Sequence, residues 1–194
     1  MSRVRASGLV QLTEAEPLVS IDDAREHLRL RHNDDDPLIA RLVDGATEFY
    51  ENRIGRQLME ASFRLELIAF PCVIELPRPP AKSVTKIEYV DTAGDLQTLA
   101  AATYQTDLAS EPARIMPAYG EVWPSTRCNT FAAVQVTFVA GYGTKPGLVP
   151  EADSIWILAA VERMYRLSSG VSDRVMRTVP MAAESLAISR KVYA

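Results

Sequence analysis

The spacing of apolar residues changes twice along this chain of 194 residues, and these changes limit the folds it can adopt. Helical spacing runs to about residue 54, alternation typical of strands follows over about 58–142, and helical spacing returns at Pro150. No helical pattern separates the strands, which favours antiparallel pairing. The sequence therefore predicts an α+β protein: a small helical domain of three main helices, an inserted antiparallel β module and a C-terminal extension.

Capping residues predict where the first two helices begin. Ser20 and Asp23 can form a capping box, which pairs amides that a first turn leaves without partners. Asp36 suits the N-cap of a second helix that opens with Pro37 and ends at Gly55.

The second helix has a broad apolar face that must be buried. Its main stripe consists of Leu38, Leu42, Ala46, Phe49 and Arg53, and beside this stripe lie Ile39, Val43 and Tyr50. A third helix over about 150–168 shows a similar face. Because neither helix can bury its face alone, we expect the second and third helices to pack together.

Short alternating runs bounded by turn residues predict the strands of the β module. They are Phe63–Leu67, Val73–Leu76, Val84–Val90, Leu96–Leu99, Tyr104–Leu108, Ala113–Met116 and Val134–Val139. The expected organisation is an N-terminal arm (1–17), a first helical part (18–57), the inserted β module (58–147), a last helix (148–170) and a C-terminal docking tail (171–194). A short helix is expected within the tail around Ala182–Ser189.

Charge is unevenly distributed along the chain, whose formal net charge is -4. Residues 1–55 carry 7 basic and 11 acidic groups, whereas residues 148–194 carry 6 basic and 5 acidic groups. An acidic protein is not drawn as a whole to nucleic acid or to anionic membranes. The acidic front and the locally basic end indicate either a solvated tail or charge-steered contact with another subunit or an acidic partner.

No residue pattern supports catalysis or cofactor binding, and we expect neither an enzyme nor a cofactor site. The two histidines, His27 and His32, lie five residues apart, whereas paired helical ligands need a spacing of three or four. The acidic run 34–36 lacks the alternating oxygens and the central glycine of a calcium loop. Phosphate loops and nucleophile elbows are also missing from the sequence.

Cysteine content and hydropathy indicate where the protein acts. Cys72 and Cys128 stand in no ligand spacing and are too few for a disulfide framework, so we expect free thiols in a reducing compartment. The sequence shows neither a signal-peptide core nor an apolar run long enough to span a membrane. We expect no membrane partner and action in the cytoplasm or in an assembly made there.

Several motifs, in the same order along the chain, resemble phage head–tail connector proteins over about 18–165. The motifs are Leu18–Leu28, Asp34–Ile39, Gly55–Leu58, Leu76–Pro80, Asp107–Ile115 and Phe138–Gly143. The resemblance implies a structural adaptor without catalytic residues, found in phages, prophages and gene transfer agents. It implies a homo-oligomeric ring of about twelve copies under the portal protein, at the head–tail junction (neck) of a virion assembled in the host cytoplasm.

The same resemblance implies that the ring joins the capsid portal to a stopper or other tail-side neck protein and leaves a channel for DNA. DNA would pass through this channel without specific binding. Three alternatives from the sequence stay open. Two are a tail-side stopper of the same junction and a DNA-binding accessory protein whose contact is the basic tail. A hydrolase with an unrecognised site is a third.

Two sets of residues follow as candidate contacts. For the portal we expect apolar and basic residues of the tail: Met181, Leu186, Ile188, Arg190, Lys191, Val192 and Tyr193. For charge contact between subunits we expect acidic residues of the front and basic residues of the end: Asp34, Asp35, Arg163, Arg166, Arg174 and Arg177.

Overall fold

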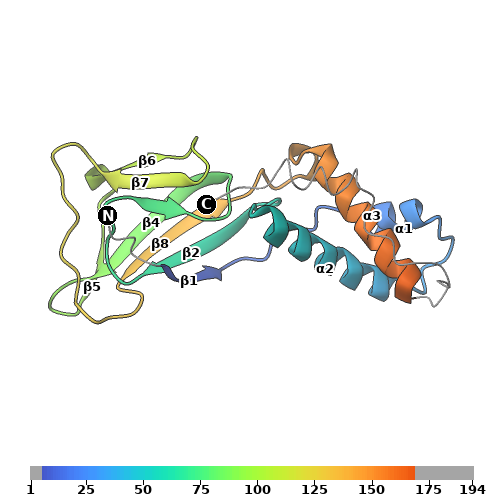
Figure 1. Cartoon of the computed structure of the whole chain (residues 1–194), viewed down its shortest axis with the longest axis horizontal. Helices are drawn as coiled ribbons and strands as arrows, with labels where there is room; N and C mark the ends of the chain where they lie inside the picture. The colour runs from blue at the N-terminus through green and yellow to red at the C-terminus, as the bar shows by residue number, and fades with distance from the viewer. Residues whose placement is uncertain (1–5, 169–194) are drawn as a thin grey trace. The chain divides into compact units, whose positions relative to one another are not determined.

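The structure is a computed structural model that describes residues 6–168 (Figure 1). Over this range the chain forms three α-helices and two antiparallel sheets, which confirms the predicted α+β class. Two compact units result. The β unit contains residues 6–15 and 60–142, and the helical unit contains residues 16–59 and 143–168. The β unit is thus inserted, in chain order, between the second and third helices of the helical unit.

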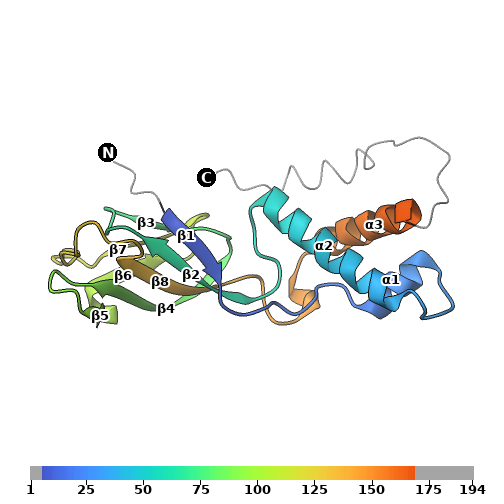
Figure 2. The same cartoon turned by 90° about the horizontal axis from the view of Figure 1, so that it is seen from below.

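Two antiparallel sheets make up the β unit. One has the order β1-β2-β8-β4-β5 and the other has the order β3-β7-β6 (Figures 1 and 2). The strands are β1 (Ala6–Gln11), β2 (Ala61–Leu67), β3 (Ile74–Leu76), β4 (Ala81–Val90), β5 (Leu96–Thr98), β6 (Tyr104–Asp107), β7 (Ala113–Pro117) and β8 (Val134–Ala140). All the strands predicted over 63–139 are present, with bounds that differ by up to three residues.

The core of the β unit lies between the inner faces of the two sheets. Alternate residues of β2 are buried, as the sequence pattern predicts, and β8 is central because it pairs with both β2 and β4. Phe63 of β2 stands opposite Phe138 of β8, with ring centroids 5.7 Å apart. Ile74 and Ile115 complete the same cluster from the smaller sheet. This packing buries the apolar residues whose alternation the sequence shows.

The N-terminal segment differs from the sequence expectation. The sequence predicts an arm without regular structure over residues 1–17. In the structure, β1 pairs with β2 at the edge of the larger sheet, and the Leu12 amide donates to the Ser62 carbonyl at 2.8 Å. Leu9 and Val10 are 38% and 39% exposed. Backbone pairing holds this edge strand with little side-chain burial, so it leaves only a weak apolar pattern in the sequence.

The helical unit consists of α1 (Ile21–Leu28), α2 (Asp36–Ile54) and α3 (Glu151–Ser168). α2 packs on α3, as predicted, and α1 contacts both of them. Its core is formed by apolar residues of all three helices and their flanks, including Ala24, Ile39, Val43, Ile157 and Val161. No described helix has the length and apolarity that crossing a bilayer requires.

The predicted capping box of α1 is confirmed. The Asp23 amide donates to the Ser20 hydroxyl at 3.0 Å, and the Ser20 amide donates to the Asp23 carboxylate at 3.4 Å. The predicted N-cap of α2 is wrong. Asp35 occupies that position without a side-chain cap, and Asp36 is the first helical residue. The reason is that the Asp36 carboxylate accepts two hydrogen bonds from the Arg25 guanidinium, at 2.9 and 3.2 Å.

The buried stripe of α2 is also displaced from the predicted one. It consists of Ile39, Val43, Ala46, Tyr50 and Ile54. Of the predicted stripe, Ala46 is buried, Leu38 and Leu42 are half-buried, and Phe49 is 59% exposed. The apolar face of α2 is therefore wider than the surface that α1 and α3 cover.

Replacing Phe138 by Ala should lower the free energy of unfolding by about 3–5 kcal/mol, because a fully buried ring would leave a cavity between the sheets. The matched control is Phe131→Ala, where the ring is 86% exposed and the expected change is about 0.5 kcal/mol or less. Urea denaturation measures both. Equal effects of the two substitutions would contradict this description of the core.

Candidate functional site

The titratable residues in the described part of the chain do not gather into a metal site. A search of these residues finds no group of three or more His, Cys, Asp and Glu side chains that could hold an ion. His27 lies 3.4 Å from Glu162, while His32 lies 3.7 Å from Asp34. Cys72 and Cys128 are exposed thiols. The polar contacts that the described residues do form fix the helices of the helical unit against one another.

A buried polar contact fixes α2 against α3. The Tyr50 hydroxyl donates to the Asp153 carboxylate at 2.8 Å, and both residues are 0% exposed. The Tyr50 ring also stacks on Trp156, with centroids 4.4 Å apart and planes 22° apart. Asp153 lies in the first turn of α3, where a carboxylate is favoured by the helix dipole. One tyrosine thus supplies a hydrogen bond and an aromatic contact to the third helix.

A second hydrogen bond joins the opposite ends of the same helices. The Tyr165 hydroxyl, near the end of α3, donates to the Asp35 carboxylate at 2.5 Å. The bond to this carboxylate holds the phenolic proton and raises the pKa of Tyr165 above its ordinary value of 10.0, with burial and the negative charge acting in the same direction. α2 and α3 are therefore held antiparallel at both ends.

Ion pairs attach α1 to one side of this helix pair. Arg25 contacts Asp22 on its own helix at 2.7 Å and Asp36 of α2 at 2.9 Å. His27 contacts Glu162 of α3, which also pairs with Arg166 one turn further along α3. Some charged residues of α1 and α3 thus form ion pairs inside the helical unit.

These contacts bear on the residues predicted for charge contact between subunits. Asp34 is exposed, but Asp35 is bonded to Tyr165 and Arg166 is paired with Glu162. Arg163 is half-buried and forms no ion pair with another described residue. The structure brings Asp35 close to α3 inside one chain, a partner that the sequence pattern does not reveal.

The remaining predicted contacts lie outside the described residues. These are Arg174 and Arg177 of the inter-subunit set and the whole portal set: Met181, Leu186, Ile188, Arg190, Lys191, Val192 and Tyr193. The short helix expected around Ala182–Ser189 lies there too.

Large apolar side chains are exposed at places that the sequence does not mark as contact surfaces. In the helical unit they include Phe49 and Leu167, at 59% and 48% exposure. In the β unit the three most exposed are Tyr119, Val122 and Phe131, all on the segment between β7 and β8. The sequence does contain a signal for the exposed residues of α2, because the apolar face of this helix is too wide for one packing partner to cover.

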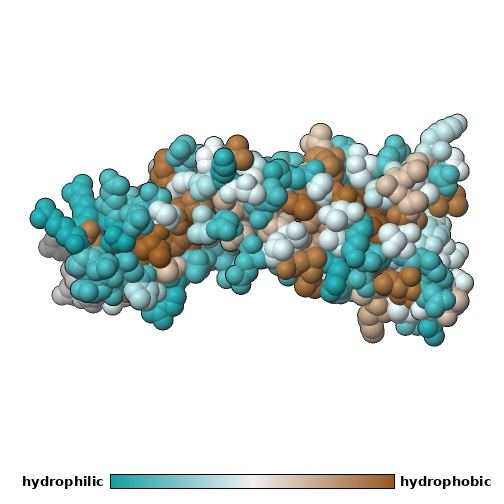
Figure 3. Space-filling model, turned by 180° about the vertical axis from the view of Figure 1, so that it is seen from behind, coloured by the Kyte–Doolittle hydropathy of each residue, from teal (hydrophilic) through white to brown (hydrophobic). Residues whose placement is uncertain are grey.

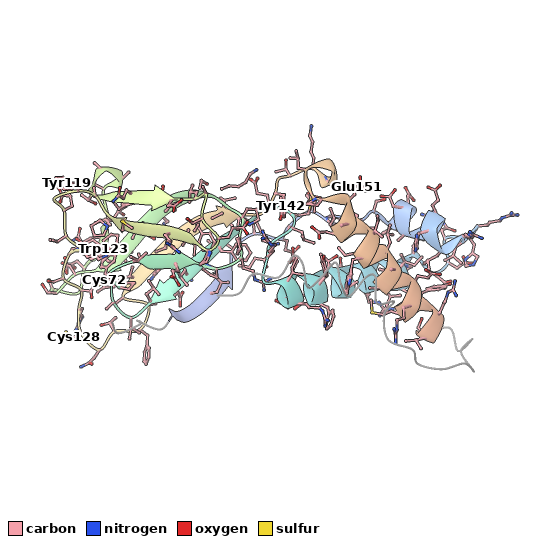
Figure 4. All side chains as sticks on the ribbon, turned by 45° about the horizontal axis from the view of Figure 1, so that its top comes forward. Cys72, Tyr119, Trp123, Cys128, Tyr142 and Glu151 are labelled. Carbon is pink, nitrogen blue, oxygen red and sulfur yellow. The ribbon has the colours of Figure 1, made fainter. Side chains whose placement is uncertain are left out.

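The segment between β7 and β8 is anchored although its tips are exposed. Trp123 stacks on Phe70 with ring centroids 4.7 Å apart, and the Arg127 amide donates to the Val90 carbonyl at 3.1 Å. Figure 4 shows Tyr119 and Trp123 at the same end of the β unit as Cys72 and Cys128. Fixed, exposed apolar side chains are typical of protein contact surfaces.

Comparison with known proteins identifies the fold. The fold is that of neck proteins of gene transfer agent (GTA) particles. One chain from the neck of an empty GTA particle, computed with C6 symmetry, has a TM-score of 0.79 and 23% identity, with 96% of both chains covered. A second, from the neck of a native GTA particle computed with C12 symmetry, has a TM-score of 0.77, 22% identity and the same coverage.

A separate comparison finds a match to part of the chain. Residues 19–90 match the family model described as phage gp6-like head-tail connector protein. The resemblance to head–tail connectors seen in the sequence is thereby confirmed. These relatives are structural proteins of the virion neck. No curated protein matches the chain.

Replacing Tyr50 by Phe should lower the free energy of unfolding by about 1–3 kcal/mol, because the buried Asp153 carboxylate would lose a donor that water cannot replace. Urea denaturation measures the loss. The control Tyr119→Phe removes a hydroxyl from a fully exposed ring and should change stability by less than about 0.5 kcal/mol. A Tyr50→Phe protein as stable as the control would show that this contact does not fix the helices.

The phenol of Tyr165 should ionise above its ordinary pKa of 10.0. Because the raised pKa favours the neutral form in the folded protein, the stabilisation by this bond is complete below that value and is lost as the pH rises through the folded pKa. Ultraviolet titration of the folded protein should therefore show one late-ionising phenol fewer in Tyr165→Phe, and no such loss in Tyr119→Phe. Loss of an early step instead would contradict the assignment.

Proposed function

We propose that this protein is a structural adaptor that forms an oligomeric ring at the portal vertex of a virion, joins the capsid portal to the tail, and leaves a channel for DNA. The observation that carries the proposal is the fold match over 96% of the chain to proteins of GTA necks. The connector family match over residues 19–90 supports it independently. The protein would act at the head–tail junction, after assembly in the host cytoplasm.

A ring of identical subunits needs two different surfaces on each copy, and the fold offers candidates for both. The symmetries of the matched particles, C6 and C12, support a ring, and we propose twelve copies. DNA would cross the ring without specific binding, which a net charge of -4 favours. Neither a cofactor nor a membrane has a part in this function.

The partners would be the portal protein on the head side and a stopper or other neck protein on the tail side. We assign portal contact to the tail, residues 171–194, which combines apolar and basic residues. The anchored segment between β7 and β8, with Tyr119 and Phe131 exposed, is a candidate for the tail-side contact.

Deleting residues 180–194 should leave a folded protein that no longer attaches to portal-bearing heads, because the proposed apolar anchors would be removed. Co-sedimentation with purified heads measures attachment, and thermal unfolding checks the fold. The control Leu96→Ser removes an apolar side chain that is 60% exposed in the β unit and should attach normally. Unchanged attachment of the deleted protein would refute the portal role of the tail.

A further inference from the structure

One side of the α2–α3 pair is left uncovered by the other described helix. Phe49 on α2 stacks on Trp156 of α3, with centroids 6.2 Å apart, but remains 59% exposed. Gly45 lies one turn before Phe49, and a Cβ built there would meet no atom within 4 Å. Leu167, near the end of α3, is 48% exposed. The surface is apolar along both helices.

Helix geometry places this surface away from α1. At 100° per residue, Phe49 lies about 140° around α2 from Asp36, the residue that Arg25 of α1 holds. On α3, Trp156 lies about 120° from Glu162, the residue that His27 of α1 contacts. α1 thus occupies one side of the helix pair, and the exposed apolar residues occupy the other.

We name this surface the open flank and define it by Leu42, Gly45 and Phe49 of α2 with Arg163 and Leu167 of α3. Arg163 shares a face with Trp156, seven residues earlier, and Leu167 follows one turn later. Arg163 is half-buried and has no ion pair with a described residue. The open flank is therefore an apolar strip with a cation beside it.

The outward face of α1 has the opposite charge. Asp22, Asp23 and Glu26 are exposed there, and Asp22 is 84% exposed even though it contacts Arg25. Glu26 forms no ion pair with a described residue. Ile21, at 38% exposure, adds an apolar side chain to the same helix. From behind, the end of the helical unit around α1 is mainly hydrophilic (Figure 3).

We propose that the open flank binds the α1 face of a second copy of this chain, with Arg163 of one copy facing Glu26 of the next. The occupant follows from charge complementarity: one side of the helical unit has an apolar strip with a cation that forms no ion pair among the described residues, and the other side has an acidic face. Two different faces in contact make a heterologous interface, which closes into a ring when the rotation allows it. The inference rests on the proposed ring function and names its interface.

A steric block tests the open flank directly. Gly45→Gln adds a side chain where the described residues leave open space, and glutamine favours a helix, so the fold should persist while the neighbouring copy is kept away. The matched control is Gly147→Gln, since a Cβ at Gly147 also meets no atom within 4 Å. We expect cross-linked multimers of the full chain to fall by about tenfold in Gly45→Gln and to stay unchanged in the control.

A charge exchange tests the pairing. Glu26→Arg and Arg163→Glu should each lower multimer yield by about tenfold through like-charge contact, and the double substitution should restore it. Single substitutions that leave the yield unchanged, or a double variant as weak as the singles, would overturn the pairing.

Site-specific disulfides separate this inference from the function on which it rests. Chains carrying Glu26→Cys and chains carrying Arg163→Cys, each with Cys72→Ser and Cys128→Ser, are mixed in solution and on portal-bearing heads. A mixed disulfide between copies supports the interface. If that disulfide forms but the wild-type chain does not attach to heads, the adaptor function fails and the interface stands.

The opposite results are equally decisive. Attachment to heads without a mixed disulfide in either setting overturns the interface and leaves the adaptor function intact. The chain's own tail is the rival occupant of the open flank. An intrachain disulfide in Arg163→Cys/Leu186→Cys, with no product between copies, would assign the surface to the tail and overturn the proposal.

Discussion

The hydrogen bond between Tyr50 and Asp153 is the contact on which the helical unit depends. It joins residues 103 positions apart, so α3 must return to α2 after the whole β unit has been inserted. Burial makes the bond selective: another alignment of the helices would leave a desolvated carboxylate without this donor, at a cost of about 1–3 kcal/mol. The bond between Tyr165 and Asp35 fixes the other end, and together the two bonds set the antiparallel register that defines the faces of the unit.

Features that depend on neighbouring residues are the ones that the sequence predicts well. The capping box of Ser20 and Asp23 is local, and the alternation of β2 reports a strand with one face in the core. The N-cap at Asp36 is wrong because its carboxylate binds Arg25, a partner eleven residues away whose position depends on how α1 packs. The sequence does not predict β1 for a related reason. This strand is held by backbone hydrogen bonds to β2, and any segment that can adopt an extended conformation can form such bonds.

The candidate contact residues also depend on partners that are distant in the sequence. Counting charges identifies an acidic front and a basic end, but it does not show which charges are already paired. Asp35 and Arg166 have partners within the helical unit, whereas Glu26 and Arg163 have none among the described residues. The apolar stripe of α2 is predicted as one buried face, and the structure divides it into a buried stripe and an exposed part that includes Phe49.

An exposed strip of this kind is unfavourable for a chain that functions alone. Phe49 keeps apolar area in water, and a glycine in the middle of α2 costs about 1 kcal/mol relative to alanine. Alanine would fit at Gly45 without a clash, so packing among the described residues does not explain the glycine. Close approach of another backbone, as proposed for the open flank, would explain it, since a glycine lets a neighbouring helix come nearer. The two unfavourable features lie one helical turn apart on the same face, and contact with a neighbouring copy would turn both into contributions to the ring.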